Sequence, residues 1–163
     1  MLDTKRILVA VVEDKPGVLT RVASLFRRRG FNIQSLAVGH SEQPGLSRMT
    51  IVVSGGSSVV EQVRKQLDKL INVIRVSDIT EEDIIARELS LIKVRATTST
   101  RNEIIQIVDV FRANIVDVAS DSLTVEVTGD ENKVSSLFEL LCSFGIKEMA
   151  RTGMIALTRG GIS

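Results

Sequence analysis

The 163-residue sequence contains no tryptophan, no tyrosine and only five phenylalanines, so aromatic residues make up 3% of it. Hydrophobic residues nevertheless reach 44%, which is ample for a folded core and argues against a disordered chain. Such a core must consist almost entirely of valine, isoleucine and leucine. These residues suit β-sheets that are covered by helices, so a fold of mixed helices and sheets is expected.

Cysteine and histidine are equally scarce, with one of each. A single cysteine forms no disulfide within the chain, and no leader of charged and then apolar residues precedes the first expected strand, so we predict a cytoplasmic protein. The sequence has no Cys-x-x-Cys or His-x-x-x-His spacing, so we predict no metal site. We also predict no membrane contact, because no apolar run approaches the roughly 18 residues of a membrane span.

Groups for catalysis are lacking as well. A nucleophilic triad usually needs a positioned histidine, and His40 lies at the end of an expected strand, where an exposed or structural role is the simpler interpretation. Cys142 lies close to Leu141 and Phe144 on an expected helix, so we predict that it is buried rather than reactive. We therefore predict no catalytic residues on this chain.

The hydrophobic pattern of residues 1–80 predicts six elements in the order β-α-β-β-α-β. They are strands at 5–12, 33–40, 47–54 and 73–79, a helix at 17–29, and a helix that follows Gly55-Gly56. Gly30 stands where a glycine ends a helix, and Ser58 with Glu61 has the spacing of a capping box. This order is that of the ferredoxin-like split βαβ unit.

The same order returns after a polar joint at residues 80–83. We expect strands at 87–97, 115–119, 123–128 and 146–157, the last bent near Gly153, with helices after Thr100 and before Gly145. Thr100 with Glu103 makes a second expected capping box. The predicted fold class is therefore α+β, an α/β sandwich of two tandem ferredoxin-like βαββαβ domains at residues 1–80 and 81–163.

A loop in the first domain has the composition of a ligand site. Pro16 and Gly17 stand where the first helix begins, and the free N–H groups of a first helical turn favour a small anion such as a carboxylate. Asp14 is placed to accept hydrogen bonds from an ammonium group. The pair of features fits an amino acid, although Asp and Pro are also favoured in an ordinary loop before a helix.

Basic residues suggest an alternative function. The first domain carries 12 Lys and Arg against 7 Asp and Glu, and the second carries 9 against 13. Arginines cluster at 27–29 with Arg21, which would suit a free-standing RNA-binding protein of ferredoxin-like fold. Such proteins stack bases on exposed aromatic rings, and only Phe26 and Phe31 are present in this half. The interpretation that we prefer is a solvated or partner-facing helix end, without nucleic acid as a partner.

The loop and the strand after its helix resemble the ligand-binding motif of the ACT domain, a βαββαβ module that binds amino acids. The matching segments are Asp14-x-Pro16-Gly17-Val18-Leu19 and Arg29-Gly30-Phe31-Asn32-Ile33. A longer pattern resembles the small regulatory subunit of acetolactate synthase, also called acetohydroxyacid synthase. It runs through residues 46–51, 66–70, 87–94, 151–153 and 156–160 and covers nearly the whole chain in order.

This resemblance implies a non-catalytic subunit in branched-chain amino-acid biosynthesis. It implies that the chain activates a large catalytic subunit, confers feedback inhibition by valine, and leaves thiamine diphosphate, FAD and Mg²⁺ to that large subunit. It also implies a homodimer of ACT domains with valine held between chains. One chain would contribute Asp14, Gly17, Val18 and Leu19, with Pro16 in the same loop, and its partner would contribute Asn32 and Ile33. The family often has asparagine in place of Asp14.

Overall fold

The computed structural model describes residues 4–160 and divides the chain into two compact units. The N-terminal unit ends at Ile85 and is rejoined by the segment that begins at Ala156, whereas Ala86–Ile155 form the C-terminal unit. This division differs from the expected boundary after residue 80. The returning segment accounts for the difference, because the backbone N–H of Arg159 donates to the carbonyl of Asp83 at 2.7 Å.

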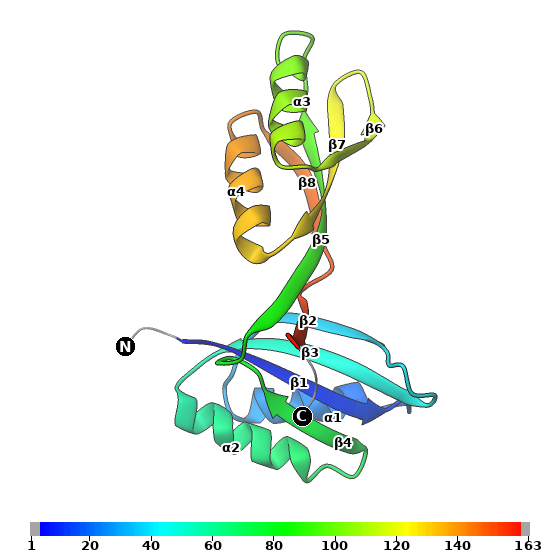
Figure 1. Cartoon of the computed structure of the whole chain (residues 1–163), viewed down its shortest axis with the longest axis vertical. Coiled ribbons are helices and arrows are strands. Elements are labelled where there is room, and N and C mark those ends of the chain that lie inside the picture. The colour runs from blue at the N-terminus through cyan, green and yellow to red at the C-terminus, as the bar shows by residue number, and fades with distance from the viewer. Residues whose placement is uncertain (1–3, 161–163) are drawn as a thin grey trace. The chain divides into compact units, whose positions relative to one another are not determined.

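The N-terminal unit is a four-stranded antiparallel sheet with two helices on one face (Figure 1). Its elements are β1 (Lys5–Glu13), α1 (Val18–Arg28), β2 (Ile33–His40), β3 (Leu46–Ser54), α2 (Ser57–Asp68) and β4 (Val73–Asp78). The strand order is β2-β3-β1-β4, so β2 and β4 are the edges. The expected βαββαβ order is confirmed, and each expected strand lies within two residues of its observed position.

The core of this unit is formed by side chains of the central strands, which point alternately to the two faces of the sheet. Leu8, Ala10 and Val12 of β1 are at most 1% exposed and pack in the cluster that α1 and α2 cover. Successive residues of a strand point to opposite faces, so Val9 and Val11 lie on the other face. Val9 is nevertheless only 5% exposed. Both faces of the sheet centre are therefore shielded from water.

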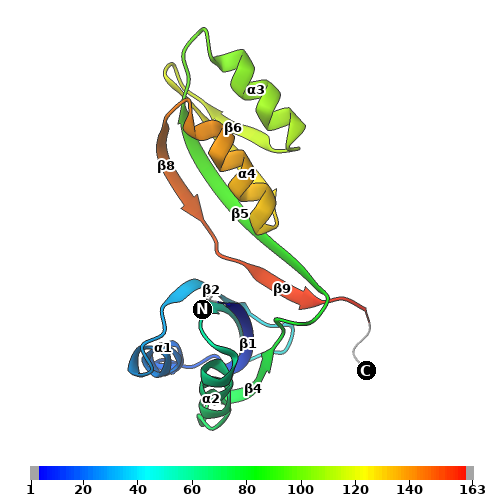
Figure 2. The same cartoon turned by 90° about the vertical axis from the view of Figure 1, so that its left-hand side faces the viewer.

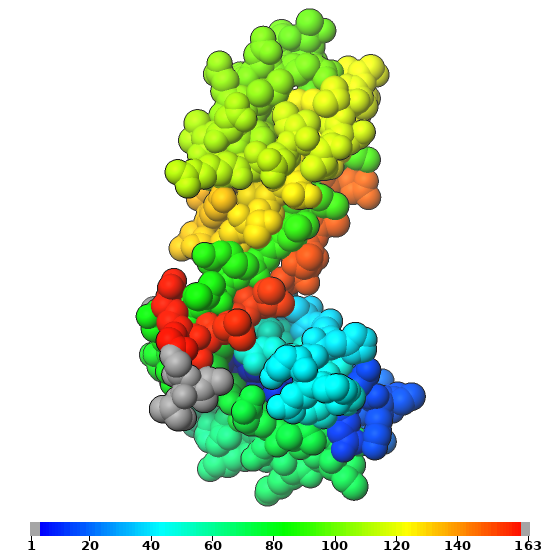
Figure 3. Space-filling view, turned by 45° about the vertical axis from the view of Figure 1, so that its right-hand side comes forward, coloured from blue at the N-terminus to red at the C-terminus, as the bar shows by residue number. Residues whose placement is uncertain are grey.

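The returning segment lies on the second face. Arg48 on β3 donates from Nη2 to the carbonyl of Ala156 at 2.8 Å, and Ala156 is 3% exposed. Figure 3 shows this segment in red on the surface of the N-terminal unit, and the strand β9 (Ile155–Thr158) that it forms pairs with β5 (Ile84–Arg95). The C-terminal end of the described chain is thus part of the N-terminal unit.

The C-terminal unit repeats the architecture. Its remaining elements are α3 (Arg101–Val110), β6 (Asn114–Val118), β7 (Ser122–Gly129), α4 (Glu131–Cys142) and β8 (Ile146–Arg151), with strand order β6-β7-β5-β8. Both helices cover one face (Figure 2), where Ile92, Val94 and Val125 are fully buried. The expected last strand is interrupted between β8 and β9, and Gly153 has a φ of 82° in this interruption. The bend predicted there is confirmed.

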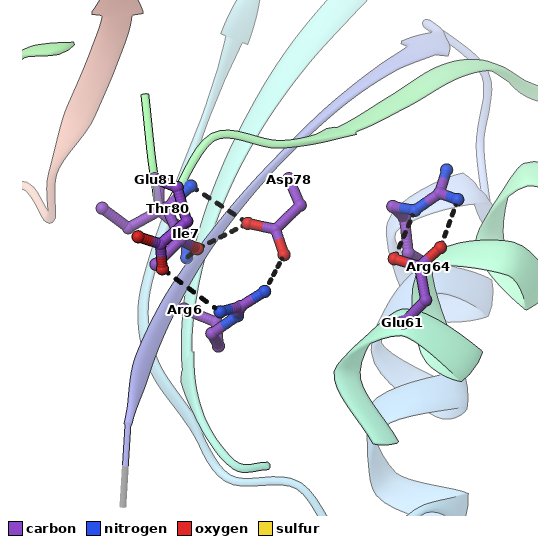
Figure 4. Close-up of polar contacts among 7 residues, drawn as sticks. All are labelled: Arg6, Ile7, Glu61, Arg64, Asp78, Thr80 and Glu81. Atoms are coloured by element: carbon purple, nitrogen blue, oxygen red, sulfur yellow. Dashed lines mark hydrogen bonds and ion pairs between the residues drawn. The ribbon is translucent and has the colours of Figure 1, made fainter. Parts of the chain in front are cut away.

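The two predicted capping boxes are wrong. At the start of α2, Gly56 is the N-cap and no side chain caps the helix, because Glu61 instead forms two hydrogen bonds with Arg64, at 2.9 and 2.5 Å (Figure 4). At α3, the Thr100 hydroxyl accepts a hydrogen bond from the backbone N–H of Thr97 at 2.9 Å and does not cap the helix. In each case a side chain of the expected capping box forms a hydrogen bond with another nearby residue.

The predicted burial of Cys142 is also wrong, since this residue is exposed. The buried stripe of α4 consists of Val134, Leu137 and Leu141, spaced by three and four residues. Cys142 follows Leu141 directly and is turned about 100° away from the stripe. The prediction was wrong because it relied on the apolar neighbours of Cys142 in the sequence and not on the helical spacing of the buried residues.

A polar network joins β1 to the end of β4 (Figure 4). Asp78 accepts hydrogen bonds from Arg6 Nη2 at 2.7 Å and from the backbone N–H and hydroxyl of Thr80. The Thr80 hydroxyl in turn accepts from the N–H of Ile7 at 2.9 Å. Burial alone would raise the pKa of Asp78, but the hydrogen bonds from Thr80 and the charge of Arg6 outweigh it, so this pKa lies below its ordinary value.

Replacing Thr80 with valine should reduce the free energy of unfolding by about 1–2 kcal/mol, because Asp78 and Ile7 each lose a partly buried hydrogen bond. A carboxyl group with a lowered folded pKa stabilises above its unfolded pKa, near 3.8, and the contribution disappears as pH falls through the folded pKa. Urea unfolding at about pH 7 and pH 3 should therefore show a larger deficit at pH 7. Thr20→Val at an exposed position of α1 is the matched control. An equal loss from both variants would contradict the network.

Candidate functional site

The loop from Asp14 to Gly17 connects β1 to α1 and is held by backbone hydrogen bonds. The N–H of Asp14 donates to the carbonyl of Gly45 at 2.9 Å, which ties this loop to the turn between β2 and β3. Gly17 is the N-cap of α1 with φ 85° and ψ −9°, a left-handed conformation that favours glycine. A Cβ built on Gly17 would meet no atom within 4 Å among the described residues. Glycine is therefore required by conformation, and the space beside it is open.

The first turn of α1 is suited to an anion. No side chain caps the helix, the first turn contains no acidic residue, and the N–H of Val18 makes only a long 3.4 Å bond to the carbonyl of Lys15. Uncapped N–H groups at the positive end of a helix attract a carboxylate. The Val18 side chain is 4% exposed and belongs to the core, so this residue offers a ligand only its backbone. Leu19, at 44% exposure, presents an apolar side chain beside it.

The charged groups around the loop form two separate pairs. Lys15 pairs with Glu13 at 2.9 Å, and this hydrogen bond, with a second from Asn72, lowers the pKa of Glu13. Asp14 is half exposed and lies 3.3 Å from Nδ1 of His40, measured from Oδ2. Because Lys15 is occupied by Glu13, the carboxylate of Asp14 is left for His40 or for a cationic group of a ligand.

His40 is the neighbour of the loop that the sequence did not indicate. It pairs with Ser47 across β2 and β3, while Glu13 pairs with Leu46 across β1 and β3. The ends of β1 and β2 therefore meet beside the start of β3. The sheet order and register bring His40 to Asp14, and neither could be derived from local sequence.

Asn32 and Ile33 lie at the other end of the sheet. Gly30, with φ 73°, ends α1 as predicted, and Ile33 then pairs with Val53 of β3. Leu46, beside the loop, and Val53, beside Ile33, are seven residues apart on this strand. At about 3.3 Å per residue the separation is roughly 23 Å. The structure brings Asp14, Pro16, Gly17, Val18 and Leu19 together, and leaves Asn32 and Ile33 out of reach within the same chain.

Aromatic residues of this unit are engaged in packing. Phe26 is 1% exposed, and Phe31 packs against the core with its ring edge-to-face to Phe26, at 6.4 Å between centroids. Neither ring is presented on the sheet for base stacking. Among residues 4–160, no group of three or more His, Cys, Asp or Glu is arranged to hold a metal ion. Within the same range, no helix has the length and apolar character needed to cross a membrane.

Comparison with known protein families gives a match for each of the two units. Residues 8–75 match the family model of the AHAS small subunit-like ACT domain, and residues 87–160 match the model of the small subunit of acetolactate synthase. The chain belongs to the acetolactate synthase small-subunit family. Its ACT domain model spans the loop, α1 and the start of β2, so all seven predicted site residues fall within the matched region.

Relatives of this family match the chain over nearly its full length. The acetolactate synthase small subunit of Mycolicibacterium smegmatis is 56% identical over 153 residues, covering 94% of this chain and 90% of the relative. That of Mycobacterium bovis is 54% identical, covering 94% and 91%. The crystal structure of the small subunit from Thermotoga maritima superposes with a TM-score of 0.88 at 41% identity, covering 98% of this chain and 99% of that one. The fold and the family prediction are confirmed.

Serine at position 17 should cost about 1–2 kcal/mol of folding free energy, because a side chain is strained in the left-handed conformation. The matched control is Gly56→Ser, since Gly56 is also an N-cap glycine with open space around it but has φ −68°. This second change should be neutral or stabilising, as serine is a favoured N-cap. Chemical unfolding of both variants measures the difference, and equal stabilities would contradict the conformational role of Gly17.

Proposed function

We propose that this chain is the regulatory, non-catalytic subunit of acetolactate synthase in branched-chain amino-acid biosynthesis. It activates the large catalytic subunit and inhibits it when valine binds. Thiamine diphosphate, FAD and Mg²⁺ are held by the large subunit. The observation that carries the proposal is the open, uncapped start of α1 beside Asp14, within a chain whose whole length matches this family.

The proposed valine site lies between two copies of the chain. The strand β2 is an edge of its sheet, and the loop lies near its His40 end while Asn32 lies at its Ile33 end. If two β2 edges pair antiparallel around a twofold axis, the His40 end of one meets the Ile33 end of the other. This arrangement supports a site made of the loop of one chain and Asn32 and Ile33 of its partner.

Each part of valine has a complementary group in this site. The carboxylate accepts hydrogen bonds from the N–H groups at the start of α1, and the ammonium group donates to Asp14. The isopropyl group packs against Leu19 and the partner's Ile33. Where the family often has asparagine, the carboxylate of Asp14 strengthens the contact with the ammonium group and repels a ligand placed with its carboxylate toward it.

Regulation requires that valine distinguish two states of the enzyme. A ligand that binds both states equally shifts no equilibrium, so the valine-bound dimer must favour a less active arrangement of the large subunit. The direct test is calorimetric titration of the purified chain with valine, followed by activity assays of the reconstituted enzyme. Saturable heat and valine-sensitive activity are expected. A folded chain that shows no heat at millimolar valine would overturn the proposal.

Gly17→Asp should abolish valine inhibition while activation of the large subunit persists, because its carboxylate would stand where the valine carboxylate binds. Gly17→Asn is the matched control, since asparagine has the same size and tolerates the left-handed conformation equally well but carries no charge. It should retain most of the inhibition. The readout is the valine concentration that halves the activity of the reconstituted enzyme. Full sensitivity of the Gly17→Asp enzyme would show that the site is misplaced.

Val38→Arg should weaken the homodimer, because Val38 is a 48% exposed apolar residue on the edge strand β2 and two copies would bring like charges together. Val59→Arg on α2, at a position 41% exposed, is the control with the same change in charge and should leave the dimer intact. Light scattering at micromolar concentration distinguishes the masses. A Val38→Arg chain that dimerises as tightly as the Val59→Arg chain would contradict pairing through β2.

A further inference from the structure

A pocket of the N-terminal unit lies on the sheet face opposite α1 and α2. It has a volume of about 280 Å³ and is lined by strand residues Val11, Leu46, Arg48, Ile74 and Arg75 and by the turn residues Ser41, Glu42 and Gln43. The neighbours of Val11 on β1, Ala10 and Val12, belong to the helix-covered core, which places Val11 on the other face. The pocket is therefore separate from the start of α1.

Strand register places two arginines in this pocket on either side of one valine. Val11 pairs with Arg48 of β3 and with Arg75 of β4, so the three residues form a row across neighbouring strands. Neighbouring strands lie about 4.8 Å apart, which sets the backbones of the two arginines roughly 10 Å from each other. Long guanidinium side chains on one face at this spacing can contact the same small ligand.

These guanidinium groups are incompletely neutralised by the described residues. The hydrogen bond to Ala156 engages only one donor atom of Arg48. Partial burial, and then the charge of Arg75, lower the pKa of Arg48, while Glu42 acts in the opposite direction. Within residues 4–160, Arg75 forms no ion pair with a carboxylate. An anion between the two arginines would relieve their repulsion.

The remaining lining indicates the kind of anion. Val11, Leu46 and Ile74 supply an apolar wall, and Ile74 is 54% exposed. A small multiply charged anion would gain nothing from this wall and would be repelled by Glu42 at the rim. A ligand with a single carboxylate and a short aliphatic body fits both the arginine pair and the apolar wall. Its carboxylate contacts the arginines, and its aliphatic body covers the wall.

We propose that this pocket binds a small aliphatic monocarboxylate through Arg48 and Arg75. The site is present in each chain and needs no residue from a second copy. It shares no lining residue with the proposed valine site.

The test uses isobutyrate as the probe and backbone amide NMR shifts of Ser41, Gln43 and Arg75 as the readout, with the full chain. Isobutyrate should bind saturably, and isobutyramide, which has the same shape without charge, should not. Inorganic phosphate should bind at least about tenfold more weakly than isobutyrate, because it lacks the apolar body. Equal binding of isobutyramide or of phosphate would overturn the proposal.

Variants locate the binding. Arg75→Gln should weaken isobutyrate binding at least about tenfold, because a charge-assisted hydrogen bond is lost. Arg27→Gln, at an exposed position on α1, is the matched control and should leave the affinity unchanged. Glu42→Gln should tighten binding by removing the opposing charge. Unchanged affinity in both the Arg75→Gln and Glu42→Gln chains would contradict the site.

Gly17→Asp separates this site from the valine site. This change should leave isobutyrate binding in the pocket as it is, whatever happens to valine. If Gly17→Asp removes isobutyrate binding, the carboxylate occupies the start of α1 and the pocket proposal fails. If Gly17→Asp removes valine binding and leaves isobutyrate binding intact, the two ligands bind at different places, which supports the pocket.

Discussion

The register of β3 against its two neighbours is the constraint on which the site depends. Because β3 pairs with β1 through Leu46 and Glu13 and with β2 through Val53 and Ile33, the loop after β1 and the start of β2 are held at opposite ends of one strand. A slip of a single residue would expose Met49, Ile51 and Val53, which fill the core. Hydrophobic burial thus fixes the distance within one chain between the two halves of the proposed site.

In the proposed homodimer, the edge strand β2 links two copies of the chain. Its two ends carry different parts of the proposed site, with Asp14 and His40 at one and Asn32 at the other. In a homodimer paired through β2, twofold symmetry would bring the loop end of one chain to the Asn32 end of its partner. In the proposed site valine contacts both chains, so its binding and the assembly of the proposed dimer are thermodynamically linked.

Much of the fold could be predicted because it rests on short-range patterns. Alternation in β1 and β3, the helical spacing of α1 and the glycines at 17, 30 and 153 specify elements and turns locally. The uncapped start of α1, on which the predicted anion site rests, is equally local. The family resemblance alone supplied the proposed roles of Asn32 and Ile33, because no spacing argument could reach them.

The wrong capping predictions concern side chains that have several possible hydrogen-bonding partners. Glu61 pairs with Arg64 instead of capping α2, and Thr100 turns to the N–H of Thr97. His40 meets Asp14 only through the sheet order, and the return of β9 to the N-terminal unit depends on contacts between residues far apart in the chain, as between Arg159 and Asp83. Tertiary structure decides such contacts.

Complementation between two defective chains tests the shared site most directly. A Gly17→Asp chain lacks the loop half and an Asn32→Ala chain lacks the other half, so each homodimer alone should fail to bind valine. Unfolding and refolding them together at equal concentration makes about half of the dimers mixed, each with one intact site, and restores roughly a quarter of the wild-type valine sites. If calorimetry finds no valine binding in the mixture, the two halves do not come from different chains and the account is contradicted.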